Sequence, residues 1–188
     1  MIKQIKEIAK VRTGVYLRPA PNPTANYLQV GDFDSSGEVR CDITPSVEAQ
    51  GKSQQHLLRD KDILFSAKGV KNFSTIYKSG TTPSFASSSF LVITIDDDSL
   101  QSEYLSWYLN LPSTIAKLQA GAVGTSMPSI SKQMIEDFEI EVPSLRVQQI
   151  VVELSVLQNR EQCLLSEIAD KRKQLIDNKL KKIIQNGI

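Results

Sequence analysis

The sequence predicts an α+β protein, in which a mixed, strand-rich globular domain over residues 1–146 is followed by one long coiled-coil helix over residues 147–188. Short apolar runs bounded by Gly, Pro, Ser and Thr fill the first ninety residues, which is typical of strands and loops. Helical spacing of apolar residues begins only after residue 98. From residue 147 to 184, neither Pro nor Gly interrupts apolar residues spaced by three and four, which predicts one continuous helix.

Four segments of the first half are predicted strands, because each combines β-branched or aromatic residues with turn signals at its ends. They are residues 26–33, 62–67, 73–78 and 90–95. The last of them, FLVITI, is an unbroken apolar run and therefore suits a buried strand. The polar stretches 19–23 and 81–89 are expected to be long loops.

Two short helices and a last strand are expected next. Ser102 can cap a first helix, and a second helix over residues 113–120 ends at Gly121, where we expect a left-handed C-cap. Ser131 can cap a further helical turn. The alternating sequence FEIEV at 138–142 then predicts a half-buried strand.

The final helix carries an apolar stripe that its own domain is too small to cover. Its 38 predicted residues, 147–184, would extend roughly 57 Å at ~1.5 Å per residue. Part of the stripe therefore needs a partner helix. The predicted helix–helix interface consists of Leu154, Leu157, Leu164, Ile168 and Leu175.

The net charge of +1 gives no sign of a polyanionic partner, but the charges are unevenly distributed. Residues 1–90 carry twelve Lys and Arg against eight Asp and Glu, whereas residues 91–146 carry three against eight. Residues 147–188 carry seven bases against five acids. The first half is therefore the electrostatically plausible side for a polyanion, although a balance of this size is also common in other proteins.

Cysteine content and the N-terminal sequence indicate the compartment. Cys41 and Cys163 are far apart and suggest neither a disulfide framework nor a metal cluster. The N-terminal MIKQIKEIAK lacks the continuous apolar stretch of a signal peptide or a membrane span. We therefore expect a cytoplasmic protein without a membrane segment.

No motif predicts catalysis. The sequence NPTA at 22–25 lacks the second proline and the aromatic residue of an amino-methyltransferase loop, and a Gly-rich cofactor turn is missing. Glu139 and Glu141 lack the nearby lysine of a metal-dependent nuclease. His56, the only histidine, has no acid and nucleophile pattern around it. We therefore expect no enzymatic activity, no cofactor and no metal, and hence a role in recognition.

Three stretches, in order, resemble the specificity subunits of type I restriction-modification systems. NYLQVGDFDSSGEV at 26–39 is similar to the family's tyrosine-bearing strand and Asp-bearing turn. LLRDKDILFSAKG at 57–69 resembles its Gly-Asp-Ile-Leu-Phe segment, with Lys61 where glycine is usual. That departure predicts a different turn before an intact strand.

The third stretch, AGAVGTSMPSISKQMIEDFEIEVPSLRVQQIVVEL at 120–154, is the most specific. It resembles the family's Gly-Ser/Thr-polar-Pro run, a short helix, an Ile-x-Val/Ile-Pro strand and a Gln that opens the spacer helix. The corresponding residues are Gly124, Thr125, Pro128, Ile130, Ser131, Ile140, Val142, Pro143 and Gln149.

The resemblance implies a non-catalytic subunit that recognises DNA, while modification and restriction subunits carry out methylation and cleavage. A complete member has two recognition domains separated by antiparallel helices, and this chain has room for one, so it resembles half a subunit, either a natural short form or a truncated gene product. The implied partners are double-stranded DNA, the modification and restriction subunits, and a second copy joined through the C-terminal helix. A fragment of a fused restriction-methylation enzyme and a structural coiled-coil adaptor remain as alternatives.

The candidate DNA contacts are basic or small polar residues of the strand-rich half. Those between residues 68 and 78 form a polar strand-and-turn pair suited to phosphate contacts beside base-edge readers, although a solvated hairpin would show the same pattern. The others lie in predicted loops. The predicted DNA-binding residues are Thr13, Arg18, Lys68, Lys71, Asn72, Thr75, Tyr77, Lys78 and Thr81.

Overall fold

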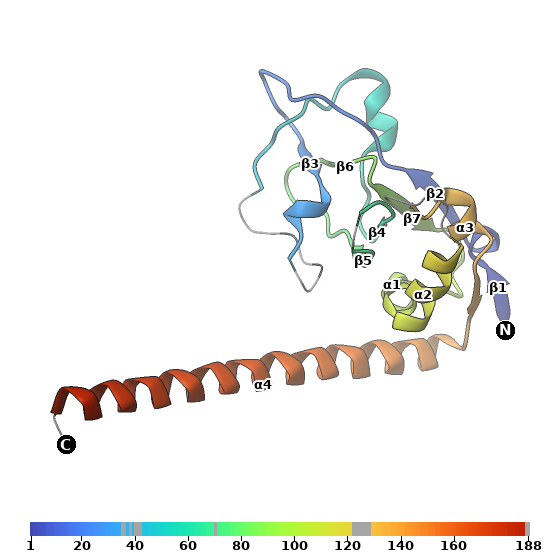
Figure 1. The fold of residues 1–188 in the computed structure, drawn as a ribbon. Coiled ribbons are helices and arrows are strands. Elements are labelled where there is room, and N and C mark those ends of the chain that lie inside the picture. Colours follow the sequence, from blue (N-terminus) through green and yellow to red (C-terminus); the bar gives the residue numbers. More distant parts are fainter. Residues whose placement is uncertain (35–36, 38, 40–42, 70, 122–128, 187–188) are drawn as a thin grey trace. The chain divides into compact units, whose positions relative to one another are not determined.

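The chain forms two compact units, Met1–Gln148 and Gln149–Ile188, in a computed structural model. The structure describes residues 1–34, 37, 39, 43–69, 71–121 and 129–186. The first unit combines strands with short helices, and the second consists of a long helix (Figure 1). The predicted α+β class is therefore confirmed. The division after Gln148 lies two residues beyond the predicted boundary.

A four-stranded sheet with the order β2-β7-β4-β5 is the centre of the first unit (Figure 1). Its strands are β2 (Ala9–Thr13), β4 (Ile63–Ser66), β5 (Ser74–Ile76) and β7 (Phe90–Ile95). All four residues of β4 and the first four of β7 are buried. An unbroken apolar sequence suits these central strands because both of their faces are covered. The predicted strand 90–95 is confirmed residue for residue.

Two small sheets flank the central one. They pair β1 (Ile2–Gln4) with β8 (Glu139–Glu141) antiparallel, and β3 (Asn26–Leu28) with β6 (Ser84–Ala86) parallel. The prediction of a loop throughout residues 81–89 is wrong, because Phe85 is fully buried in a side core and draws β6 into pairing. Short 3-10 turns occupy Ile5–Glu7, Val30–Asp32 and Gly51–His56.

Three short helices follow the central sheet: α1 (Ser102–Asn110), α2 (Pro112–Ala120) and α3 (Lys132–Glu136). The predicted cap of α3 is confirmed, since the Ser131 hydroxyl accepts a hydrogen bond from the Met134 N–H at 3.2 Å. The predicted cap by Ser102 is wrong, because Gln101 is the N-cap of α1 and Ser102 is its buried first residue.

The expected left-handed C-cap at Gly121 is also wrong. Its φ of −86° and ψ of −9° are right-handed, and its N–H donates to the carbonyls of Lys117 and Gln119. These bonds satisfy carbonyls at the end of α2 without a positive φ.

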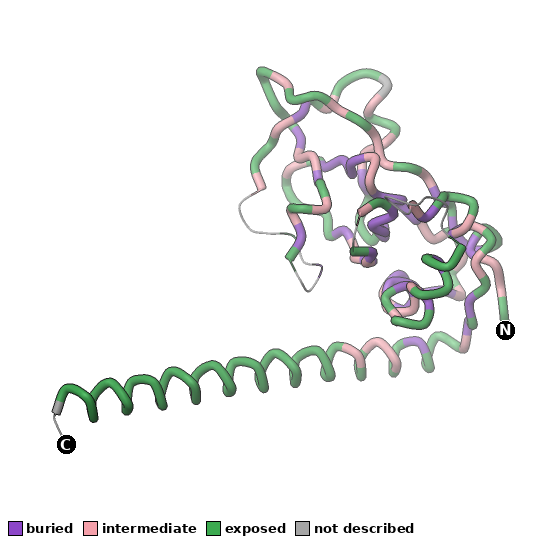
Figure 2. Tube along the Cα trace, viewed as in Figure 1, coloured by how far each residue is buried: buried purple, intermediate pink, exposed green. Residues whose placement is uncertain are grey.

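Helix α4 (Leu145–Asn186) contains 42 residues, which exceeds the predicted helix by two residues at each end. Its side chains are exposed from Glu153 to Gln185, apart from half-buried Ser155 (Figure 2). The five predicted interface residues are between 43% and 65% exposed. Within the described chain, these apolar side chains have no cover.

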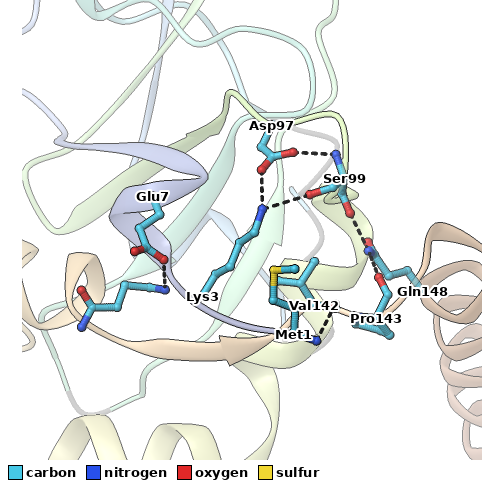
Figure 3. A network of polar contacts seen from close by, with 9 residues as sticks. Met1, Lys3, Glu7, Asp97, Ser99, Val142, Pro143 and Gln148 are labelled. Atoms are coloured by element: carbon cyan, nitrogen blue, oxygen red, sulfur yellow. Dashed lines mark hydrogen bonds and ion pairs between the residues drawn. The ribbon is translucent and has the colours of Figure 1, made fainter.

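The first turn of α4 belongs to the globular unit because Gln148 is fully buried there. Its side-chain amide donates to the carbonyls of Ser99 at 2.7 Å and Pro143 at 2.9 Å (Figure 3). Its Oε1 accepts from the Gln101 N–H at 2.9 Å. Gln149, which the resemblance matched to the family's helix-opening Gln, is exposed, and its side-chain amide donates to Glu153 at 3.0 Å. In this chain, the glutamine that anchors the helix is therefore its neighbour Gln148.

The same network reaches the N-terminal strand (Figure 3). The Lys3 Nζ lies 2.8 Å from the Asp97 Oδ2, and the Ser99 N–H donates to the Asp97 Oδ1 at 2.8 Å. The hydrogen bond from Lys3 holds the pKa of the Asp97 carboxyl well below its usual range. Ser99 thus links this ion pair to Gln148.

We predict that Gln148→Ala lowers the free energy of unfolding by about 2 kcal/mol, because two carbonyls and one N–H lose their buried hydrogen-bond partner. Gln149→Ala, one residue away and exposed, is the matched control and should change it by less than about 0.5 kcal/mol. Urea unfolding of both variants measures the difference. Equal effects would contradict the assignment of Gln148 as the anchor.

Candidate nucleic-acid interface

The direction of the strands brings several loops of the first unit together. Every neighbouring pair in the four-stranded sheet is antiparallel, so the ends of β2 and β4 lie beside the starts of β5 and β7. Two backbone bonds of 2.9 Å join the loops there: Gly14 N–H donates to the Phe90 carbonyl, and Ala67 N–H to the Ser89 carbonyl. We call this region, residues 13–18, 67–69, 71–73 and 87–89, the basic end.

The other end of the sheet is equally well connected. The Lys61 N–H donates to the Tyr77 carbonyl at 2.9 Å, and the Asp96 N–H to the Ile8 carbonyl at 3.1 Å. These bonds bring together the starts of β2 and β4 with the ends of β5 and β7. We call this region, residues 8–10, 59–62, 77–80 and 96–98, the mixed end.

Charge differs sharply between the two ends. The basic end contains three bases, Arg18, Lys68 and Lys71, and no Asp or Glu. The mixed end contains four bases and five acids, and Lys10 there pairs with Asp96 at 2.7 Å. A polyanion is therefore attracted to the basic end and gains little at the mixed end.

The predicted DNA contacts do not form one patch. Exposed Thr13, now the last residue of β2 rather than part of a loop, lies at the basic end with exposed Lys68 and Lys71. Lys78 lies at the mixed end, and Thr75 is half-buried on edge strand β5. Exposed Arg18, four residues beyond Gly14, also belongs to the basic end, whereas exposed Thr81 lies in the loop between β5 and β6.

Two predicted contacts are buried and hold the fold together instead. The Asn72 amide donates to the Ser66 carbonyl at 2.8 Å, and its Oδ1 accepts from Gln119 of α2 at 2.9 Å. Tyr77 is 7% exposed and packs in the core cluster that contains Leu64. Neither side chain is presented to a ligand, so we remove both from the candidate surface.

The lysines of the basic end sit on an anchored hairpin. The Ser66 N–H donates to the Phe73 carbonyl at 2.8 Å, and its hydroxyl donates to the Lys71 carbonyl at 3.2 Å. Ile130 is buried, and its N–H donates to the Ala67 carbonyl at 3.0 Å. The third family-like stretch thus supports this hairpin. Its members Gly124, Thr125 and Pro128 lie outside the described residues.

The sequence analysis did not single out a buried ion pair in the central sheet. Asp62 is 1% exposed and accepts from the Arg12 Nη2 at 3.1 Å and from the Thr94 hydroxyl at 2.6 Å. Arg12 also donates to the carbonyls of His56 and Leu57. With its guanidinium so occupied, Arg12 serves the fold rather than a ligand.

Lys61 takes the left-handed conformation that favours glycine, with a φ of 66°. This conformation is the one that a glycine would adopt readily at this position. The strand that follows is intact, as expected, because β4 begins at Ile63.

Other kinds of site are not found in the part of the chain that the structure describes. There, no group of three or more His, Cys, Asp or Glu could hold a metal ion. None of the described helices is long and apolar enough to cross a membrane.

Comparison with known families decides what kind of domain this is. Residues 1–182 match the model of the type I restriction modification DNA specificity domain. The chain belongs to this family. The predicted family is therefore confirmed, and its description as a DNA specificity domain agrees with the predicted role in recognition.

Solved structures of specificity subunits share the fold. The S subunit of a type I restriction-modification system from M. genitalium matches with a TM-score of 0.59 and 17% identity, over 92% of this chain and 42% of its own. The HsdS subunit from Thermoanaerobacter tengcongensis matches with a TM-score of 0.60 and 16% identity, over 87% and 38%.

A third structure concerns the complex assembly and conformational transition of the type I R-M system. It matches with a TM-score of 0.62 and 18% identity, over 87% of this chain and 39% of its own. The chain therefore spans about two fifths of the length of these proteins. No curated protein matches the chain in sequence.

We predict that Lys61→Gly raises the free energy of unfolding by about 0.5 to 1 kcal/mol. A left-handed backbone costs a non-glycine residue about 1 to 2 kcal/mol, which outweighs the roughly 0.5 to 1 kcal/mol of chain entropy that glycine loses on folding. Lys78→Gly, an exposed lysine without a positive φ, is the control and should lower stability. A lower free energy of unfolding in Lys61→Gly would show that the left-handed conformation of Lys61 is not strained.

Proposed function

We propose that this chain acts as a non-catalytic specificity subunit that recognises double-stranded DNA and directs modification and restriction subunits to it. The family match supports a role in DNA recognition and covers residues 1–182, so it leaves no segment of this chain for a methyltransferase domain. A protein that acts on host DNA works where that DNA lies, so we propose a cytoplasmic location. The observation that carries the proposal is that the described segments of the basic end, residues 13–18, 67–69, 71–73 and 87–89, contain three bases and no Asp or Glu.

The basic end is the proposed DNA surface. Lys68, Lys71 and Arg18 are exposed and supply phosphate contacts, and the exposed Thr13 hydroxyl supplies a small polar contact beside them. Thr81 stays a candidate on the neighbouring loop. We leave Thr75 and Lys78 outside this surface because of their places on the edge strand and at the mixed end.

We predict that the double variant Lys68→Glu, Lys71→Glu weakens DNA binding and reduces its salt dependence. Each phosphate contact that is lost lowers the slope of log K against log salt by about 0.9. Lys78→Glu, which makes half of this charge change at the mixed end, is the control for each single variant, Lys68→Glu and Lys71→Glu. Fluorescence anisotropy with duplex DNA at several salt concentrations measures the slopes. An equal loss in Lys78→Glu would show that the basic end has no special role.

We propose further that α4 pairs with α4 of a second copy. The apolar stripe of Leu154, Leu157, Leu164, Ile168 and Leu175 is exposed in one chain and has the spacing of a coiled-coil seam. An adaptor built only for this pairing would not need the first unit, whose 148 residues have a core and a basic surface of their own.

The charges of α4 favour antiparallel pairing with an identical chain. Residues 149–170 carry one base and four acids, whereas residues 171–186 carry six bases and one acid. An antiparallel pair places the acidic half of each helix beside the basic half of the other. A parallel pair would place like charges together, which costs free energy.

We predict that Leu164→Asp together with Ile168→Asp converts a dimer into a monomer. Two carboxylates forced into an apolar seam should cost several kcal/mol, on the order of the desolvation cost of buried charges. Gln162→Asp with Ser166→Asp adds the same charge on the opposite face of the helix and should leave the dimer intact. Light scattering gives the mass of each variant. An unchanged mass in the first variant would show that this seam does not join two copies.

A further inference from the structure

Tyr16 is the one aromatic residue of this chain that stands out in solvent. Its exposed fraction is 74%, whereas the other eleven aromatic residues, all described, are buried or half-buried. A single exposed aromatic side chain is ordinary by itself. What distinguishes Tyr16 is the way the chain holds it and what surrounds it.

The backbone around Tyr16 is tied to the central and flanking sheets. Val15 N–H donates to the Ala86 carbonyl at 2.9 Å, and the Tyr27 hydroxyl donates to the Val15 carbonyl at 2.8 Å. Val15 and Leu17 pack against the side core around Phe85. The chain therefore alternates, with Val15 and Leu17 directed inward and Tyr16 exposed between them.

Gly14 shows how closely this segment approaches β6. A Cβ at this position would lie 2.1 Å from the Ser87 carbonyl oxygen and 2.6 Å from that of Ala86. Because both atoms belong to the backbone rather than to a flexible side chain, only glycine fits at position 14. The segment that carries Tyr16 is thus pressed onto the sheet rather than hanging free.

The electrostatic surroundings of Tyr16 suit a polyanion. Residues 8–31 contain three bases and no Asp or Glu. Two of these bases are engaged, Lys10 with Asp96 and Arg12 with Asp62. The third, Arg18, is exposed and has no ion pair with any described residue. It lies two residues from Tyr16, so in the alternating segment both side chains are exposed while Leu17 between them is directed inward.

We propose that Tyr16 contacts a base edge in the DNA groove and contributes to the choice of target sequence, while Arg18 binds a phosphate beside it. This inference rests on the proposed DNA recognition. The guanidinium of Arg18 can bind a phosphate of the DNA backbone, a contact that carries no sequence information. The apolar ring of Tyr16 can contact a base edge, and such apolar contacts do distinguish between bases. A ring held on an anchored backbone loses little conformational entropy when it binds.

The test begins with the full-length wild-type chain, which selects its target from randomised duplexes. Affinities are then measured for the selected duplex, for each single-base variant of it, and for unrelated duplex DNA. The proteins are the wild type, Tyr16→Ala, Tyr16→Phe and Arg18→Ala. Urea unfolding checks that each variant is folded. Because both side chains are exposed, we expect little change in the free energy of unfolding.

We expect Tyr16→Ala to bind the target about 10-fold more weakly, the equivalent of one apolar or hydrogen-bonded base contact, and to lose discrimination at one base position. Its affinity for unrelated DNA and its salt slope should stay unchanged. Tyr16→Phe should retain discrimination. Arg18→Ala should weaken target and unrelated DNA alike and lower the salt slope by about 0.9.

Two outcomes would overturn the inference and leave the proposed function standing: unchanged discrimination in Tyr16→Ala, or an equal loss on target and unrelated DNA. Failure of the wild-type chain to select any sequence would instead overturn the proposed function, and the inference with it.

Discussion

The pairing of β4 with β7 is the constraint on which the rest of the first unit depends. Ile63 lies opposite Ile93 and Leu64 opposite Val92, and all four side chains are fully buried. Two central strands covered on both faces leave almost no place for charged side chains except the ends of the sheet. Asp62 is buried at one of these ends, where Arg12 and Thr94 donate hydrogen bonds to its carboxyl group. The separation of charge between the basic end and the mixed end follows from this arrangement, and so does the proposed DNA surface.

Helix α4, unlike the central strands, has an apolar stripe that the described part of its own chain does not cover. Buried Gln148 joins its first turn to the globular unit, whereas the apolar stripe beyond it is exposed in a single chain. The acidic and basic halves of the helix give it a polarity that an identical antiparallel copy can match. A closed pair of identical chains has a two-fold axis, so both recognition surfaces are the same, and duplex DNA matches that symmetry with an inverted repeat.

Local signals predicted β7, the cap at Ser131 and α4, because each depends on residues that are neighbours in sequence. The missed β6 depends on pairing with β3, 58 residues earlier at Asn26 and Ser84, and on burial of Phe85, neither of which its polar sequence shows. For the same reason the sequence could not reveal that α2 and the core bury Asn72 and Tyr77. The alternation of apolar Val15 and Leu17 with Tyr16 was a signal that could have been used. The family-like stretches identified the domain but not which of two adjacent glutamines is the anchor.

The most direct test of the whole account is a map of methylated adenines in host DNA when this chain is the sole specificity subunit co-expressed with its cognate modification subunit. The two-fold pair predicts two short half-sites, inverted with respect to each other and separated by a gap of unspecified bases, with modified adenines on opposite strands. A continuous or asymmetric motif would contradict recognition by two identical chains.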